Sequence, residues 1–582
     1  MKLLARTSVA IACLFAAGCS SESRSLQTRK SARPDASLDS GRSDASSSDS
    51  GVSRIFPVAL NPQAIGSKDT SKLLFAAFSQ VGTSSSDSQV LDLAPDIVPR
   101  TWSQWDIYGT RPSDYNFTYT KNCQSKGIAF IGGLTASVIF QDEMNADDFA
   151  DEVGRDAENS PVAHSEIVAG AYRGTLASPG FRQRLIDIAK IQIDGGVDGL
   201  FFDEVNSSYI GANYNGDEGF DDHQVADFGR FLCSNYASNP DKLASLDLAP
   251  HDLLNCNDAD PGATFDYRGY LSRHNAQTAP LGPLNPLAPE WGTTIQNRPD
   301  PANGTFVETA APLVYWQDIV MQVRNYARQA YNKEIFITAN GIFPFVDFQT
   351  VGLYDWNKDS TALRGFDYVP VVGGHYDGTV SFLTVLSNLK TTSKRLVESA
   401  GGHEVPLLLF LDWPTDSINR YYAMPTSERQ DYVRIFTAEA YALGMMLALP
   451  LSTTTDTSTA TALGMLDSFT RLRAFYSAHA ALYQGARPLA GNPTVSASNV
   501  TTQLNSLPNS QTALHLINHN YSSGVIAQTQ VAVSIPLTQA PKSVTVASPD
   551  YPADVDVPFD FSGGQITFTV GSLGASAVVW VR

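Results

Sequence analysis

Basic residues are scarce relative to acidic ones in this chain of 582 residues. It contains 40 Lys and Arg residues against 59 Asp and Glu residues, so its formal net charge at pH 7 is -19. Nucleic-acid binding depends on clustered Lys and Arg side chains that neutralise phosphates. The composition therefore excludes a nucleic acid as the partner, and the acidic balance is typical of a soluble protein.

Cysteine is also rare, with five residues in the whole chain. No Cys-x-x-Cys pair is present, so a structural zinc site is not expected and no metal ligand is predicted. Cys233 and Cys256 bracket a loop-rich stretch that a disulfide would stabilise if the protein is exported, which would leave Cys123 over and buried. The sequence alone does not decide this pairing.

Near the N-terminus, Lys2 and Arg6 precede a short apolar stretch at residues 9–17. Basic residues followed by such a stretch are typical of a signal peptide, and the stretch is too short to span a membrane. The segment ends in Ala16-Ala17-Gly18-Cys19, which resembles the lipobox of bacterial lipoproteins. That resemblance implies that Cys19 is lipidated and anchors the protein in the cell envelope. Because no Asp follows the cysteine, it further implies the outer membrane; an ordinary cleaved secretory signal is the alternative.

Aromatic residues are absent between residues 20 and 53, where Ser, Asp, Arg and Ala dominate. Such a segment cannot bury enough apolar surface to fold, so we expect a flexible tether. The domain prediction is a signal peptide with lipobox at 1–19, a tether at 20–53, a catalytic domain at 54–487 and a C-terminal domain at 488–582.

Strand-like apolar runs alternate with helical patterns through the third of these segments. The eight candidate strands are residues 73–78, 97–100, 128–134, 199–203, 334–340, 366–372, 407–412 and 446–451. Credible helices lie between several of them, such as 308–331 and 427–443. Alternation of this kind predicts an α/β protein with a parallel sheet, and the count of eight favours a (β/α)8 TIM barrel. Residues 238–301, rich in Pro, Asn and Asp, interrupt the rhythm as an insertion that either shapes the substrate path or is a solvated decoration.

The C-terminal segment has a different periodicity. Apolar and polar residues alternate in 513–518, 531–535, 543–546, 565–570 and 577–581, and Gly, Pro, Asn and Asp separate these runs. A period of two residues predicts half-buried strands, and their number predicts a small antiparallel β-sandwich. Such a domain could bind carbohydrate, but covering one side of the barrel is the favoured role.

The strand at 199–203 ends in two adjacent carboxylates, Asp203 and Glu204. The carboxyl ends of barrel strands face the active site. The run 407–412 repeats this design and ends in Asp412, which is the best second acid. Glycoside hydrolysis needs two carboxyl groups, one to protonate the leaving oxygen and one to attack carbon or activate water. Because neighbouring strand residues face opposite sides, Asp203 is favoured as nucleophile or base, with Glu204 as the acid or as a supporting residue.

Aromatic and amide side chains follow other predicted strands and are the candidates for substrate binding. Aromatic rings suit the C–H faces of sugars, and polar side chains can hold the hydroxyls. The candidates are Trp102, Trp105, Asn340, His375, Tyr376 and Trp413. Packing in the core or in loops, and a turn at Asn340-Gly341, are the alternatives for these residues.

The segment 198–204, followed by Gly219-Phe220-Asp221-Asp222 and a helical pattern at 225–236, resembles barrel-type glycoside hydrolases, particularly the dextranase-like family 66. The resemblance implies a nucleophile on the fourth strand, which corresponds to Asp203, and a Glu near the sixth strand as acid/base. The sixth candidate strand, 366–372, has no Glu.

These observations predict a surface-tethered glycoside hydrolase that acts on an oligo- or polysaccharide without a cofactor. The partners are then the carbohydrate and, through the lipid anchor, a membrane. The alternatives are a catalytically inactive carbohydrate-binding lipoprotein and a barrel hydrolase that places a cation on Asp203 and Glu204. The sugar, the linkage, the stereochemistry and the oligomeric state are left open.

Overall fold

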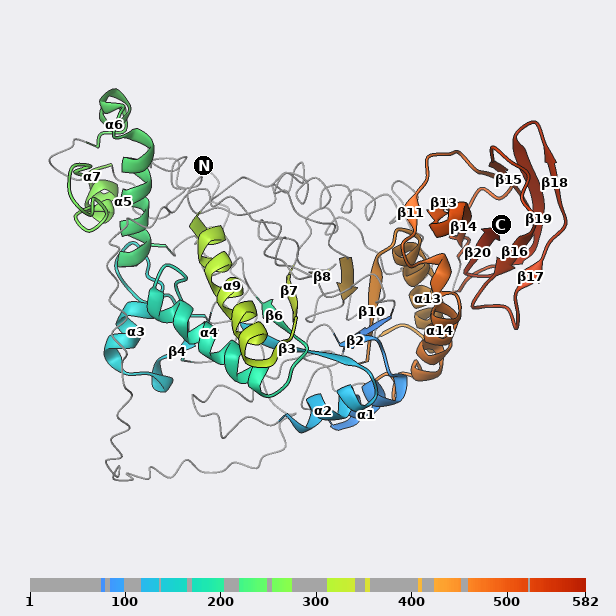
Figure 1. Cartoon of the computed structure of the whole chain (residues 1–582), viewed down its shortest axis with the longest axis horizontal. Coiled ribbons are helices and arrows are strands. Elements are labelled where there is room, and N and C mark those ends of the chain that lie inside the picture. The colour runs from blue at the N-terminus through green and yellow to red at the C-terminus, as the bar shows by residue number, and fades with distance from the viewer. Residues whose placement is uncertain are drawn as a thin grey trace, which may run out of the picture. The chain divides into compact units, whose positions relative to one another are not determined.

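Figure 1 shows a computed structural model of the chain. The chain divides into two units, residues 1–52 and 53–582. The structure describes residues 75–78, 84–98, 117–135, 138–164, 170–203, 219–248, 254–274, 311–340, 351–355, 407–410, 423–451, 459–521 and 524–582, all of which belong to the second unit. The signal peptide, the tether and Cys19 therefore lie outside the described residues.

Eight parallel strands form a closed barrel, so the predicted (β/α)8 architecture is confirmed. Each strand pairs in parallel with the next, and the last pairs with the first. In order around the barrel they are β1 (Ala76–Phe78), β2 (Ile97–Val98), β3 (Ala129–Thr135), β6 (Gly199–Asp203), β7 (Phe336–Asn340), β8 (Val351–Asp355), β9 (Leu407–Phe410) and β10 (Met446–Pro450).

One of the eight predicted strands was wrong. The other seven coincide with barrel strands to within a few residues, but the sixth barrel strand is β8 rather than residues 366–372, which lie outside the described residues. The run at 366–372 is more apolar than Val351–Asp355, which contains a glycine. The run at 366–372 also contains Pro370, however, and a proline cannot donate a hydrogen bond to the ladder of a central strand. Pro370 therefore argues against a barrel strand at 366–372.

Helices alternate with the barrel strands as the sequence periodicity predicts. They are α1 (Ser84–Leu93), α2 (Thr118–Ser125), α4 (Pro179–Asp194), α9 (Ala311–Tyr331), α13 (Thr426–Ala442) and α14 (Leu466–Ala478). Helix α4 shows why: Ser178 caps it by accepting from the Phe181 N–H at 3.2 Å, and Pro179 occupies its first position. Gly196, at φ +97°, provides the left-handed turn into β6. Helices α4 and α9 lie side by side (Figure 1).

Two excursions leave the barrel at the carboxyl ends of its strands. After β3 the chain forms β4 (Val138–Phe140), η5 (Gln141–Glu143), α3 (Ala146–Glu152) and β5 (Ala171–Arg173), with β4 and β5 antiparallel. Between β6 and α9 it forms α5 (Asp222–Tyr236), α6 (Pro240–Ser245) and α7 (Tyr267–Arg273). A disulfide joins Cys233 of α5 to Cys256, and Cys123 is buried and takes no part in it, as the sequence suggested.

The C-terminal region is the expected antiparallel sandwich. One sheet has six strands in the order β11-β13-β14-β20-β16-β17, and the other has four in the order β12-β15-β19-β18. The elements of this region are η6 (Ala480–Leu482), β11 (Arg487–Pro488), β12 (Thr494–Val495), β13 (Val500–Leu507), η7 (Pro508–Ser510), β14 (Gln511–Asn518), β15 (Gln528–Pro536), β16 (Val544–Ala547), β17 (Val555–Asp556), β18 (Phe559–Ser562), β19 (Gln565–Leu573) and β20 (Ser576–Val581).

The six-stranded sheet packs on the barrel through helix α13. Its central strand β14 contributes Leu514 and Leu516 to the sandwich core, whereas Ala513 and Ile517 belong to the larger core that includes the barrel. Both faces of this sheet are therefore buried, which agrees with the favoured role of covering one side of the barrel.

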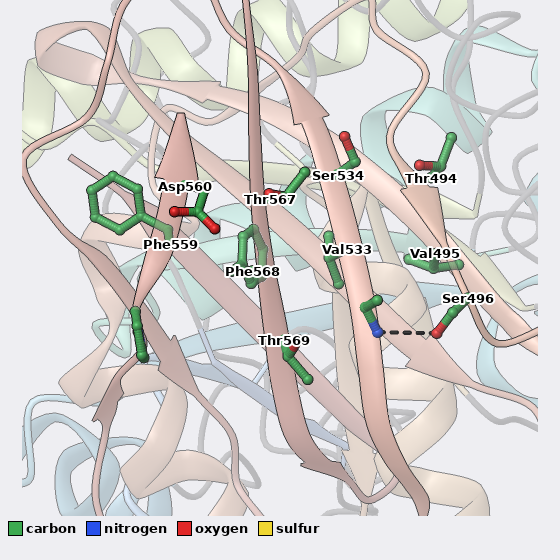
Figure 2. A pocket seen from close by; sticks show the side chains of 12 residues that line it. Thr494, Val495, Ser496, Val533, Ser534, Phe559, Asp560, Thr567, Phe568 and Thr569 are labelled. Atoms are coloured by element: carbon green, nitrogen blue, oxygen red, sulfur yellow. Dashed lines mark hydrogen bonds between the residues drawn. The ribbon is translucent and has the colours of Figure 1, made fainter. Parts of the chain in front are cut away.

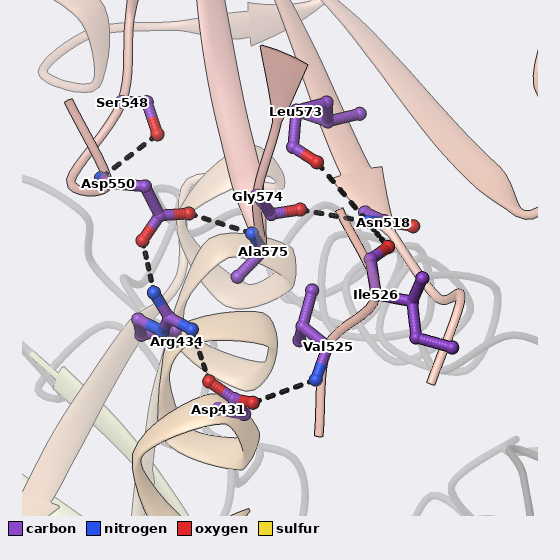
Figure 3. Close-up of polar contacts among 10 residues, drawn as sticks. All are labelled: Asp431, Arg434, Asn518, Val525, Ile526, Ser548, Asp550, Leu573, Gly574 and Ala575. Atoms are coloured by element: carbon purple, nitrogen blue, oxygen red, sulfur yellow. Dashed lines mark hydrogen bonds and ion pairs between the residues drawn. The ribbon is translucent and has the colours of Figure 1, made fainter. Parts of the chain in front are cut away.

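Polar contacts also hold this interface (Figure 3). Arg434 of α13 pairs with Asp431 on its own helix and with Asp550 of the sandwich. Asp550 in turn accepts from the Ala575 N–H at 2.7 Å, and Asp431 accepts from the Val525 N–H at 2.8 Å. The two carboxylates and the guanidinium thus connect helix α13 to the sandwich loops.

Candidate active site

Polar residues end three consecutive strands of the barrel. Asp203 is the last residue of β6, Asn340 of β7 and Asp355 of β8. All three lie at the carboxyl end, which carries the active site in enzymes with this architecture. The structure describes these residues by their backbone positions in the strands.

The register places the three positions on one face of the sheet. A Cβ added at Gly132 of β3 would lie 2.1 Å from Oε1 of Gln192 on α4, so position 132 faces the outer helices and position 135 faces the barrel interior. Position 203 pairs with 135. Because Phe201 pairs with Thr338, position 340 lies on this same inner face.

The same alternation extends to β8. Asn340 pairs with Leu353, so positions 353 and 355 are inner positions as well, and Asp355 pairs with Phe410 of β9. The carboxyl end of the barrel therefore has two Asp positions and one Asn position on its inner face, on the fourth, fifth and sixth strands.

A dense set of contacts fixes β6 at its opposite end. The Asp198 carboxylate accepts from the Phe130 N–H at 3.0 Å and from Gln124 Nε2 at 2.9 Å, and it lies 3.3 Å from Nζ of Lys333. A Cβ at Gly199 would lie 2.6 Å from the Phe336 carbonyl oxygen, so only glycine fits between β6 and β7 there. Asp198 is thus a structural carboxylate that sets the position of the strand bearing Asp203.

The other predicted catalytic and substrate-binding residues all lie outside the described residues. These are Glu204, Asp412, Trp102, Trp105, His375, Tyr376 and Trp413. Asp412 follows the last residue of β9 by two positions in the chain. Their roles stay predictions.

Sequence reasoning did not single out Asp355, because it placed the sixth strand too late in the chain. A signal was available in Tyr354-Asp355-Trp356, which has the same order of apolar residue, Asp and Trp as Leu411-Asp412-Trp413. Comparison of these two segments would have added Asp355 to the candidates.

The two excursions are joined to each other next to this end of the barrel. The Phe220 N–H donates to the Arg155 carbonyl at 3.0 Å, and Nε2 of His223 lies 2.7 Å from Oδ1 of Asp151. The hydroxyl of Ser178 donates to the other oxygen of Asp151 at 2.7 Å. The start of α5 is therefore tied to α3 and to the start of α4.

Two carboxyl groups at the start of α5 and within it have shifted pKa values. Burial raises the pKa of Asp221 to about 6, although the Gln224 N–H donates to it. Burial also raises the pKa of Asp227 to about 6, against the opposing charge of Arg230 at 2.6 Å. Since Asp221 caps α5 and Asp227 is paired, both carboxyls have structural partners.

The described residues contain neither a metal-binding cluster nor a membrane-spanning helix. No group of three or more His, Cys, Asp or Glu side chains that could hold a metal ion occurs among them. None of the helices in the described part of the chain is long and apolar enough to cross a membrane.

A scan of family models and a search of curated proteins both find no match to the chain. Among solved structures, it is similar to a cycloisomaltooligosaccharide glucanotransferase of a Paenibacillus species complexed with cycloisomaltoheptaose. The TM-score is 0.50 at 9% identity, over 88% of this chain and 85% of that one. A maltogenic α-amylase of Thermotoga neapolitana gives a TM-score of 0.47 at 10% identity, over 88% and 99% of the two chains. At 9% identity the likeness to the glucanotransferase shows the fold alone.

Proposed function

We propose that this protein is a glycoside hydrolase that cleaves an oligo- or polysaccharide at the carboxyl end of its barrel. The observation that carries the proposal is the placement of Asp203 and Asp355 at inner positions of β6 and β8, with Asn340 between them. Glycoside hydrolysis is the reaction for which two carboxyl groups suffice. The glucanotransferase of the same fold supports a carbohydrate as the substrate, because that enzyme is complexed with the cyclic oligosaccharide cycloisomaltoheptaose.

Asp203 is assigned as the nucleophile or base, which agrees with the resemblance to the dextranase-like family 66. That resemblance calls for an acid/base near the sixth strand. The sixth strand is β8, and it ends in Asp355. Asp355 is therefore a second candidate for the acid, beside Asp412.

Strand spacing is compatible with such a pair. Neighbouring strands lie about 4.8 Å apart, so β6 and β8, separated by β7, are roughly 10 Å apart at the backbone. Two Asp side chains that extend towards each other from this distance would bring their carboxyl groups within the range of about 5 to 9.5 Å that glycosidases use. Asn340, on the strand between them, is proposed to bind a sugar hydroxyl.

The test is release of reducing ends from a panel of α- and β-glucans, galactans and xylans. Parent protein is compared with Asp203→Asn, Asp355→Asn and Asp412→Asn, and Asp222→Asn serves as the matched control because the Asp222 side chain is 92% exposed. We expect Asp203→Asn and one of the other two to lose at least about a thousandfold in rate, and the control to keep it.

The outcomes separate the alternatives. Full activity of Asp203→Asn would refute its assignment. Sugar binding without release by the parent would identify an inactive binding protein, and loss of activity on chelation would identify a metal-assisted hydrolase. Azide rescue of Asp355→Asn or of Asp412→Asn would identify which residue is the acid/base.

We further propose that the protein is exported and anchored by a lipid on Cys19, with residues 20–53 as the tether. The lipobox-like Ala16-Ala17-Gly18-Cys19 supports this proposal. Expression of parent and Cys19→Ala in a Gram-negative host tests it, since the parent should fractionate with the outer membrane and the variant should not. Equal fractionation of the two would refute the anchor.

A further inference from the structure

The outer face of the four-stranded sheet carries a hollow of about 670 Å³. Residues of β12, β15, β19 and β18 line it, so it crosses the whole width of the sheet (Figure 2). Volumes of roughly 300 to 1,000 Å³ are typical of small-molecule sites. We call this hollow the sandwich groove.

A row of four polar side chains crosses the floor of the sandwich groove. Thr494 pairs with Ser534, Ser534 with Thr567, and Thr567 with Asp560, each on a neighbouring strand. Because paired residues of adjacent strands lie on the same face, three hydroxyls and one carboxylate form a continuous line. Figure 2 shows these four labelled side chains along the same face.

A second row runs beside the first. It contains Ser496, Ala532 and Thr569, of which Ala532 and Thr569 are register partners. The Ser496 hydroxyl accepts from the Ala532 N–H at 3.0 Å, which joins the edge strand β12 to the sheet. Thr567 and Thr569 are exposed, and no hydrogen bond to either hydroxyl occurs within the described part of the chain. Their donors and acceptors therefore face the groove.

The side chains of the groove select one class of ligand. The twelve lining residues include no Lys, Arg or His, so the groove does not suit an anion. Of its two aromatic residues, which are register partners, Phe568 is buried in the sandwich core and Phe559 is partly buried against it, so the polar part of the open surface is made of hydroxyls and the carboxylate of Asp560. Hydroxyls and a carboxylate complement the hydroxyl groups of a neutral sugar.

We propose that the sandwich groove binds a neutral oligosaccharide segment, as a second carbohydrate site distinct from the barrel. The proposal rests on the proposed function only for the class of ligand, since a polymer cleaved at the barrel would extend to other surfaces. Binding at both places would hold the polymer by two contacts and raise the effective concentration of sugar near the barrel.

The experiment measures retardation in native gels that contain soluble starch, dextran, pullulan or xylan. The full chain carries Asp203→Asn, so that binding is measured without turnover. Thr567→Val with Asp560→Asn removes one hydroxyl and the carboxylate of the polar row but preserves side-chain shape. Thr529→Val is the matched control, because Thr529 is an exposed residue of β15 outside the groove.

We expect the groove variant to bind the retarding polysaccharide about tenfold more weakly, as the loss of hydrogen bonds worth about 1.4 kcal/mol in total implies. The control should bind as the parent does. The proposal would be overturned if the Asp203→Asn chain, the groove variant and the control were retarded equally. It would also be overturned if no polysaccharide retarded any of the three proteins.

A second readout separates the two proposals. In the chain with Asp203 intact, the groove variant should hydrolyse short soluble oligosaccharides at the parental rate. Loss of polymer binding with normal hydrolysis of short substrates supports both proposals. Normal binding with normal hydrolysis overturns the groove alone, and binding that depends on the groove without any hydrolysis overturns the proposed function alone.

Discussion

Strands β14 and β19 have nearly the same length and belong to the same sandwich, but they are buried in different ways. In β14, seven of eight residues are buried, whereas β19 alternates between exposed and buried residues for most of its length. The outward residues of β14 include Ala513 and Ile517, which join the core shared with the barrel. Those of β19 include Thr567 and Thr569, which face the sandwich groove. One sheet of the sandwich is therefore a packing surface, and the other presents its polar face to solvent.

The largest difference should come from placing a charge on each of the two faces. Ala513→Asp buries a carboxylate among apolar side chains with no partner, so we expect a loss of more than about 4 kcal/mol in the free energy of unfolding. Ala532→Asp, on the exposed face of β15, should cost less than about 1 kcal/mol. Thermal and urea unfolding measure both, and similar losses would contradict the assignment of covered and open faces.

Truncation on the two faces of β19 itself should give the next largest difference. Phe568 is buried in the sandwich core, so Phe568→Ala should cost about 3 to 5 kcal/mol. Thr569→Ala, one residue further along the strand, should cost less than about 1 kcal/mol. Calorimetry of both variants provides the measurement, and a large loss for Thr569→Ala would show that its face is covered.

Removal of the charge that joins the barrel to the covered sheet should have an intermediate effect. Arg434→Ala leaves the mostly buried carboxylates of Asp431 and Asp550 without their cation. Because the Arg434 side chain is 28% exposed, water offsets part of the penalty, and we expect a loss of about 2 to 3 kcal/mol. Arg471→Ala, on the exposed side of α14, is the control and should change stability little. An equal effect of the two substitutions would exclude a role for the ion pairs.

The smallest of the expected effects is a loss of stability at low pH, caused by a histidine buried on the covered sheet. Burial lowers the pKa of His515 on β14 to about 3. As the pH falls below about 6.5, the unfolded chain binds a proton on this imidazole and the folded chain does not, so stability is lost. The loss should reach about 2 kcal/mol at pH 5. His515→Gln should therefore lose less stability than the parent between pH 7 and pH 5 in urea unfolding, and parallel curves would contradict the burial.

The amount that could be predicted differs between the barrel strands. The strand 199–203 was located correctly because Gly195 and Gly196 end the preceding helix and an unbroken apolar run follows. The strand Val351–Asp355 was missed because a glycine dilutes its apolar pattern, and its place in the barrel depends on hydrogen bonds to β7 and β9. The missed strand removed Asp355 from the candidate residues.

The amino-acid sequence is enough to predict the alternation of strands and helices, the capped start of α4, the period of the sandwich strands and the position of Asp203 at the end of β6. These features follow from local periodicity and from the fixed conformational preferences of Gly, Pro and capping side chains. The folded chain was needed to show that β8 is the sixth strand, that positions 203, 340 and 355 share the inner face, and which sheet of the sandwich is covered. The register between strands that are distant in sequence, and the packing of one surface on another, depend on contacts that no local pattern encodes.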